Sequence, residues 1–172
     1  SDLQPQATAK IVGLVNLDSR KATPTTTPFD PTDPTTYNDS TAVTVFDSLG
    51  NSHTLQSYFV KGAAPNVWQV FTTADGISTT ALPTPSATLT FPATGTGLNP
   101  TSVPASPTAV TFAPLNPPIP PATVPTIPTG AAAVSLTMDY SGSTQFGSNF
   151  SINSLSQDGY TSGRLAGFNT GA

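Results

Sequence analysis

Residues 41–73 read TAVTVFDSLGNSHTLQSYFVKGAAPNVWQVFTT, and this stretch decides the fold. Three runs in it, at 42–46, 54–60 and 67–71, are rich in the β-branched and aromatic residues that fit the pleated surface of a strand. Polar segments that contain glycine separate the runs, as they do in antiparallel hairpins. We therefore predict a three-stranded antiparallel meander, closed by a further turn at Asp75-Gly76.

The first turn of this meander is the segment 47–52, DSLGNS, and the second is the segment 61–66, KGAAPN. Gly50 and Asn51 are suited to positive φ, which most other residues avoid. A β-branched residue at Gly50 would therefore be costly, and the tight turn predicts antiparallel pairing of the strands beside it.

The core of the meander is expected to be small and aromatic, built on the 9 Phe, 4 Tyr and one Trp of the chain. The leading core candidates are Phe46, Phe59, Trp68 and Phe71. The strand period of two leaves open which face each of these side chains occupies. For Trp68 we favour the core over an exposed aromatic platform.

Further strands are predicted on both sides of the meander. Residues 7–18 place Ile11, Val15 and Leu17 on one face of a strand. Residues 20–40 contain Thr-Pro and Asp-Pro steps and are expected to be a connection. One or two closing strands are predicted from residue 131 on, where Val134, Leu136 and Met138 alternate with smaller or polar residues and a later short run holds Phe150, Ile152 and Leu155.

A proline-rich region extends from 83 to 128 and holds 13 of the 19 prolines. Proline cannot donate a backbone hydrogen bond, which favours extended polyproline II geometry over a central strand. Within this region, 87–91 and 109–112 are short β-prone pieces isolated by prolines. We expect a long surface excursion here.

The composition supports an all-β fold and argues against several classes of protein. The 172 residues match one domain, 1–172, and only 8% of them are charged, which excludes a coiled coil. The chain contains 30 Thr, 18 Ser, 19 Pro and 13 Gly, which interrupt helices or lower their propensity. The fold class is therefore an antiparallel β-barrel or a sandwich-like domain. Nucleic acid is not an expected partner, because the net charge is −4 and binding phosphates requires clustered Lys and Arg.

The sequence also bears on cross-links and membranes. It has no Cys, which excludes disulfides and thiolate metal sites within it. No run approaches 18 apolar residues, so we expect no membrane insertion. The start at Ser1, without an initiating Met and without the basic and apolar parts of a signal peptide, is interpreted as the start of a fragment.

Catalytic and cofactor chemistry is not predicted. His53 is the only histidine, so a Ser-His-Asp arrangement would have to use it, with Asp47 or another Asp to orient it. The alternative is that His53 begins a strand and is solvated or hydrogen-bonded to the preceding turn. Asp47, Asp75 and Asp158 are interpreted as turn residues rather than as a glycosidase pair. We expect no enzyme activity, no cofactor and no metal.

Two parts of the chain resemble a known family. Residues 44–55, TVFDSLGNSHTL, with 58–61 and 66–71, resemble the middle region of bacterial flagellar hook proteins. Residues 143–147, STQFG, and 157–165, QDGYTSGRL, resemble the segment where the hook chain leaves its outer domain. The residues that carry the resemblance are Asp47, Gly50, Asn51, Phe59, Trp68, Gln157, Asp158, Gly159, Tyr160 and Gly163.

The resemblance implies an all-β outer domain inserted in a longer hook subunit, with 1–6 and 161–172 leading toward inner domains that this sequence lacks. Hook subunits polymerise into a bent extracellular tube, a universal joint that transmits torque, after export through the flagellar type III channel. The resemblance thus implies other copies of the same protein as partners. It does not identify the subunit contacts, and nothing in the family matches 83–128.

The surface composition suits such a joint. Short hydroxyl and amide side chains can exchange partners across a sliding interface, because each net hydrogen bond contributes only about 0.5–1.5 kcal/mol. We expect the isolated chain to remain monomeric, because such contacts are weak and the polymerising ends are missing. The alternative function is a surface-exposed carbohydrate-binding or adhesin β module that uses Trp68 and nearby aromatic residues as a platform.

Overall fold

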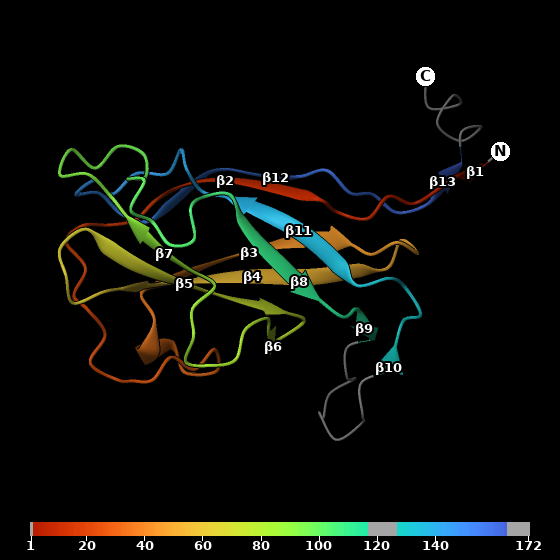
Figure 1. Ribbon diagram of the computed structural model, residues 1–172, viewed down its shortest axis with the longest axis horizontal. Coiled ribbons are helices and arrows are strands. Elements are labelled where there is room, and N and C mark those ends of the chain that lie inside the picture. The colour runs from red at the N-terminus through yellow and green to blue at the C-terminus, as the bar shows by residue number, and fades with distance from the viewer. Residues whose placement is uncertain (1, 117–126, 165–172) are drawn as a thin grey trace.

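Two β-sheets that share one core make up most of the structure (Figure 1). The computed structural model describes residues 2–116 and 127–164. The first sheet has the order β12-β2-β11-β8, with β2 at Lys10–Asn16, β8 at Thr108–Phe112, β11 at Val134–Asp139 and β12 at Ser151–Gln157. The second has the order β3-β4-β5-β6, with β3 at Asp39–Phe46, β4 at Ser52–Lys61, β5 at Val67–Ala74 and β6 at Ile77–Ser78.

The remaining elements are short. Strand β7, Ala87–Thr90, pairs with the first half of β5, whereas β6 pairs with the end of β5. Two small ladders lie outside the main sheets, β1 (Asp2–Leu3) with β13 (Gly163–Arg164), and β9 (Leu115–Asn116) with β10 (Ile127–Pro128). A single 3-10 turn, η1, spans Pro34–Thr36. Among the described residues the pairings form separate sheets rather than a closed barrel, so the predicted all-β fold is confirmed in its sandwich-like form.

The predicted meander is confirmed as β3, β4 and β5, which pair antiparallel in unbroken register. Gly50 has φ +83°, as expected, but Asn51 does not adopt positive φ. The amide of Gly50 donates to the carbonyl of Asp47, and the amide of Asp47 donates to the carbonyl of Asn51. One left-handed residue is enough to reverse the chain in such a turn, so Asn51 can rejoin the extended backbone.

The core lies between the two sheets. Phe59 and Trp68 are fully buried there, which confirms two of the core predictions. The prediction for Phe46 is wrong, because Val45 is the buried residue and Phe46 is only half-buried. Adjacent strand residues point to opposite faces, so the inward position of Val45 turns Phe46 away from the core.

A second, smaller apolar cluster covers the other face of β4 and β5. Phe71 lies here rather than in the main core, stacked on Phe29 with ring centroids 4.1 Å apart and the planes at 15°. Tyr58 completes the cluster. Phe29 belongs to the segment 20–40, so that segment is more than a connection, because it covers one face of the second sheet.

The region 83–128 contributes to both sheets. Within it, β7 and β8 pair with neighbours, and Leu89, Phe91 and Val110 enter the core, so these pieces are not isolated as expected. Both strands lie at sheet edges. An edge strand makes backbone hydrogen bonds to a neighbour on one side only. Prolines, which lack the N–H donor, are therefore tolerated in or beside such a strand. Residues 117–126, part of the predicted excursion, lie outside the described residues.

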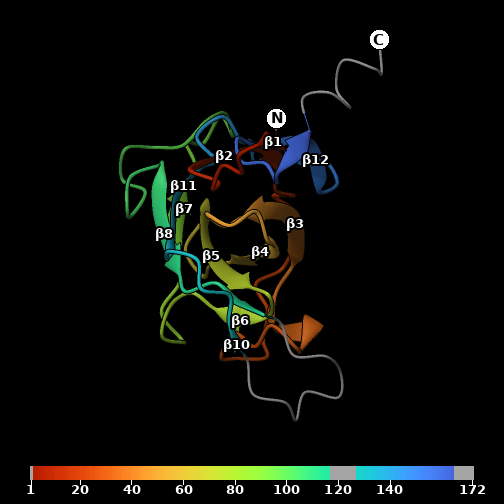
Figure 2. The ribbon, with the colours of Figure 1, turned by 90° about the vertical axis from the view of Figure 1, so that its right-hand side faces the viewer.

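Strand β2 lies in the middle of the first sheet and buries Ile11 and Val15, with Leu17 just beyond its end, as predicted. It pairs in parallel with β11 and antiparallel with β12, the last long strand. The beginning and the end of the fold therefore lie side by side, and β1 and β13 extend from the same end of the sandwich (Figure 1), which is the end that faces the viewer in Figure 2.

Candidate functional site: the junction of the chain ends

The two ends of the described chain form a narrow antiparallel ribbon. Strand β1 pairs with β13, and farther in, the amides of Gln6 and Tyr160 each donate to the carbonyl of the other residue at 2.9 Å. Gly163 lies opposite Leu3 in the β1–β13 ladder. We name the region formed by residues 2–10, 46–51 and 157–164 the junction.

Asp158 ties the ribbon to β2. Its Oδ1 accepts hydrogen bonds from the backbone amides of Ala9, at 2.8 Å, and Lys10, at 3.0 Å. Partial burial opposes ionisation, but these two amides outweigh it, so the pKa of the Asp158 carboxyl lies below its usual range. The side chain therefore holds the outgoing chain against the incoming one as a charged group.

Gln157 and Gly159 bring the two chains into close contact. The Gln157 side chain accepts from the Thr8 hydroxyl at 2.6 Å and from the amide of Gly159 at 2.7 Å. A β-carbon at Gly159 would lie 2.7 Å from the Thr8 backbone nitrogen and 2.9 Å from the carbonyl oxygen of Gln6. Only a residue without a side chain fits this position while the two chains remain paired.

The turn 47–52 supports the ribbon from the second sheet. The Thr161 hydroxyl donates to the carbonyl of Gly50 at 2.9 Å, and a β-carbon at Gly50 would lie 3.0 Å from the Pro5 side chain. Asp47 holds the turn through its Oδ1, which accepts from the amides of Leu49 and Asn51 at 3.0 Å. The turn therefore acts as a rigid support for the ribbon.

Thr8 connects these parts, and the sequence did not single it out. Its amide donates to the Phe46 carbonyl, its hydroxyl oxygen accepts from the Phe46 amide at 3.0 Å, and that hydroxyl donates to Gln157. One buried hydroxyl thus links β3 to both chain ends. Nothing distinguishes Thr8 in the sequence, because it is one of 30 threonines.

His53 lies beside the turn and is buried, so of the two alternatives, solvation or a hydrogen bond to the turn, the hydrogen bond is confirmed. Its Nε2 lies 2.8 Å from Asp47 Oδ2 and its Nδ1 lies 2.6 Å from Asp75 Oδ2. Burial favours the neutral ring, but the two carboxylates outweigh it and raise the pKa of His53. Burial also opposes ionisation of Asp47, yet His53 and the turn amides hold its pKa below the usual range.

Phe59 and Trp68 lie in the core and not at the junction. The indole nitrogen of Trp68 donates to Gln145 Oε1 at 2.6 Å, and the amide nitrogen of Gln145 donates to Asn66 at 2.9 Å. Trp68 thus anchors the segment 143–147, the second part of the family resemblance. The structure brings the other highlighted residues together at the junction: Asp47, Gly50, Asn51, Gln157, Asp158, Gly159, Tyr160 and Gly163.

Comparison with known proteins identifies the family. The model of the flagellar basal body protein FlaE D2 domain matches residues 16–160, most of the chain. The chain belongs to this family. It is similar to the flagellar hook protein FlgE of Escherichia coli strain K12, with 43% identity over 82 residues, or 48% of this chain and 20% of that protein. The Salmonella typhimurium FlgE is 42% identical over 82 residues, 47% of this chain and 20% of that protein.

A solved structure supports the assignment. The 32 kDa fragment of the flagellar hook protein FlgE from Caulobacter crescentus has a TM-score of 0.50 and 25% identity, and the match covers 71% of this D2 chain and 46% of that chain. The D2 chain spans about a fifth of the length of the curated relatives. These relatives are named hook proteins, and their names denote no enzyme.

The burial of Trp68 bears on the alternative function. A carbohydrate-binding or adhesin module would need this side chain at the surface, but its exposed fraction is 0%. The relatives described above are named hook proteins, not adhesins or carbohydrate-binding modules. The D2 domain therefore offers no support for the aromatic platform on which that alternative was based.

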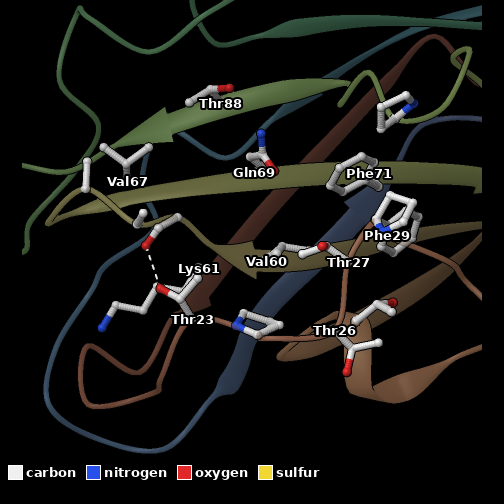
Figure 3. A pocket seen from close by; sticks show the side chains of 17 residues that line it. Thr23, Thr26, Thr27, Phe29, Val60, Lys61, Val67, Gln69, Phe71 and Thr88 are labelled. Carbon is white, nitrogen blue, oxygen red and sulfur yellow. Dashed lines mark hydrogen bonds between the residues drawn. The ribbon is translucent and has the colours of Figure 1, made fainter.

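The D2 domain has a groove of about 590 Å³ over the second apolar cluster (Figure 3). Phe29, Val60 and Phe71 lie along it, and the Thr23 hydroxyl donates to the carbonyl of Gly62 at its margin. The described residues that line it include no carboxylate or imidazole, and the ammonium group of Lys61 donates to the carbonyls of Ser19 and Lys21. None of the highlighted family residues lines this groove.

Residues 2–116 and 127–164 contain no cluster of three or more side chains arranged to bind a metal ion. No helix in those ranges has the length and hydrophobicity that crossing a bilayer requires.

Replacing Asp158 with alanine is expected to lower the free energy of unfolding by about 1–2 kcal/mol, because two backbone amides lose their acceptor. The folded-state pKa is below the usual 3.8, so this stabilisation is present above pH 3.8 and is lost as the pH falls through the folded-state pKa. Urea unfolding at pH 7 measures the effect. Asp158→Asn is the matched control: it keeps one carbonyl oxygen and is expected to lose less. Equal midpoints for Asp158→Ala and wild type would contradict the prediction.

Proposed function

We propose that this D2 chain is the outer β domain of a flagellar hook subunit, attached to the rest of the subunit through the junction. The observation that carries the proposal is the pairing of both chain ends at one end of the sandwich, through β1 with β13 and Gln6 with Tyr160. A domain inserted in a longer chain needs such an arrangement, because its two connections must leave together.

The junction is suited to transmit force. A single extended connection can swivel about its backbone bonds, whereas two hydrogen-bonded strands must turn together. Asp158 and Thr8 fasten this ribbon to β2 and β3, and the carbonyl of Gly50 accepts from Thr161 at its side. A load on the ribbon is therefore shared by several hydrogen bonds in both sheets, and we infer that the domain follows its connections as a unit.

We further propose that the domain packs against neighbouring copies in the extracellular hook polymer through polar contacts that exchange as the tube bends. Strand β12 supports this, because it is an edge strand and four of its polar residues, Ser151, Asn153, Ser154 and Ser156, are exposed. Each hydroxyl or amide contact contributes only about 0.5–1.5 kcal/mol, so partners can be exchanged at small cost. On this view the isolated domain is monomeric.

Immunogold electron microscopy on the source cells tests the proposal, with antibody raised against residues 1–172. We expect gold on the short curved segment between the cell body and the filament. Cells carrying an in-frame deletion of the coding region provide the control for antibody specificity. Gold along the filament or over the cell body, absent from the deletion strain, would overturn the hook assignment.

A further inference from the structure

His53 bridges two carboxylates that belong to different turns. Its Nε2 faces Asp47, between β3 and β4, and its Nδ1 faces Asp75, between β5 and β6. A carboxylate only accepts hydrogen bonds, so two such contacts require an N–H on both ring nitrogens. Only the imidazolium form has both, so two contacts to ionised carboxylates suit a protonated His53.

The surroundings of His53 contain no other charged partner among the described residues. Strand β8 contributes Phe112, whose ring lies edge-on to the imidazole with the centroids 5.8 Å apart. The connection between β10 and β11 contributes Thr129, whose hydroxyl donates to Asp47 Oδ2 at 3.3 Å. The segment 127–132 and strand β8 have no titratable side chain. Burial therefore opposes the protonation of His53, and Asp47 and Asp75 are the charged groups that favour it.

The two carboxylates are held unequally. The Asp47 side chain is fully buried and also accepts from the amides of Leu49 and Asn51 and from Thr129. The Asp75 side chain is 14% exposed, and its other bond is from the amide of Thr54 to Oδ1 at 2.8 Å. When the ring keeps one proton, the buried carboxylate has the greater need of it, because water can solvate Asp75 but not Asp47.

We propose that His53 is a pH-dependent latch: when protonated it ties the β5–β6 turn to the turn 47–52 of the junction, and loss of one proton releases the β5–β6 turn at Asp75. The released carboxylate turns to solvent while the bond between His53 and Asp47 persists. The β5–β6 turn and the turn 47–52 would thus be coupled at a pH below the His53 titration and independent at a pH above it.

The direction of the response follows from the charges. The folded-state pKa of His53 lies above the usual value of about 6.5, so the bridge is complete below pH 6.5 and is lost as the pH rises through the folded-state value. The folded-state pKa of Asp47 lies below 3.8, so its side of the bridge fails only as the pH falls through that lower value. The latch therefore opens on the alkaline side, as the pH rises through the folded-state pKa of His53.

NMR on the isotopically labelled 172-residue chain between pH 5 and 10 tests the latch. The His53 ring shifts report its titration, and amide exchange, corrected for the intrinsic pH dependence, reports each turn. We expect protection at the amides of Thr54 and Asp75 to fall about tenfold together with the His53 titration, as for an equilibrium displaced by one pH unit. Protection at Leu49 and Asn51 is expected to stay constant.

The variant Asp75→Asn separates the latch from general loosening of the domain. It keeps the shape of the side chain but removes the charge that holds the second proton, so His53 is expected to titrate at lower pH and Thr54 to lose its pH dependence. Titration of wild-type His53 without any change at Thr54 and Asp75 would overturn the proposal. Equal loss of protection at Leu49 and Asn51 would also overturn it, because that pattern means that the whole end of the sandwich opens. Neither outcome depends on the hook assignment.

Discussion

Replacing Trp68 with alanine is expected to lower the free energy of unfolding by about 3–5 kcal/mol, the cost of removing a large buried aromatic side chain from a close-packed core. Trp68 is fully buried between the sheets, and its indole nitrogen holds Gln145. The substitution therefore removes packing and also leaves the buried Gln145 oxygen without its donor. Urea unfolding followed by circular dichroism measures the loss, since the variant has no tryptophan fluorescence.

Two matched variants separate these contributions. Trp68→Phe keeps most of the ring contact but lacks the N–H, and we expect it to lose about 1–3 kcal/mol. Phe146→Ala removes an aromatic side chain that is 44% exposed, and it is expected to cost less than either core substitution. An unfolding midpoint for Trp68→Ala equal to that of wild type would contradict the burial of this residue.

The parts of the fold that could be predicted are those with local signals. The meander combines β-branched runs with turns that contain Gly50 and Gly76, and both glycines have the positive φ that marks a tight reversal. The assignment of Phe46 failed for a local reason as well. Residues 42–46 read Ala, Val, Thr, Val and Phe. One face of the strand therefore carries Val43 and Val45 and the other carries Phe46, so the pattern cannot select the face that points into the core.

The two strands of the proline-rich region, β7 and β8, could not be assigned to a sheet from the sequence, because proline indicates only where a strand cannot lie. Proline excludes a central strand but permits an edge strand. Which sheet edge such a segment joins depends on strands that lie far away in the sequence. Strand β8 pairs with β11, which follows it in the sequence only after more than one intervening segment. Its place in the first sheet has no counterpart in the local sequence.

The junction was indicated by family resemblance rather than by periodicity. Gln157, Asp158 and Gly159 were highlighted in this way, but their partners were not, because Thr8 lies 149 residues from Gln157 and has no distinguishing neighbours. Asp75 was assigned to a turn, and its second role as a partner of His53 requires the β4–β5 pairing. Contacts that depend on the register of two strands become visible only once the sheet is assembled.

Replacing Gly159 with alanine is expected to lower the free energy of unfolding by about 2–3 kcal/mol, in the range that overpacking costs. The added β-carbon would lie 2.4 Å from the Thr8 hydroxyl, 2.7 Å from the Thr8 backbone nitrogen and 2.9 Å from the Gln6 carbonyl oxygen. Backbone atoms cannot move aside as the end of a flexible side chain can. The two chain ends must therefore separate.

The separation has a local signature that distinguishes it from general destabilisation. In Gly159→Ala, amide exchange is expected to quicken first at Gln6 and Tyr160, which donate to each other across the ribbon, while the β4–β5 ladder stays protected. Gly163→Ala is the matched control, because its β-carbon would approach only the Leu3 side chain, at 4.0 Å, and we expect a change within about 0.5 kcal/mol. Wild-type protection at Gln6 and Tyr160 in Gly159→Ala would show that the ribbon tolerates a side chain. A loss in Gly159→Ala but not in Gly163→Ala would place the tight contact between the paired segments at Gly159, so that a side chain there loosens the ribbon before it unfolds the sandwich.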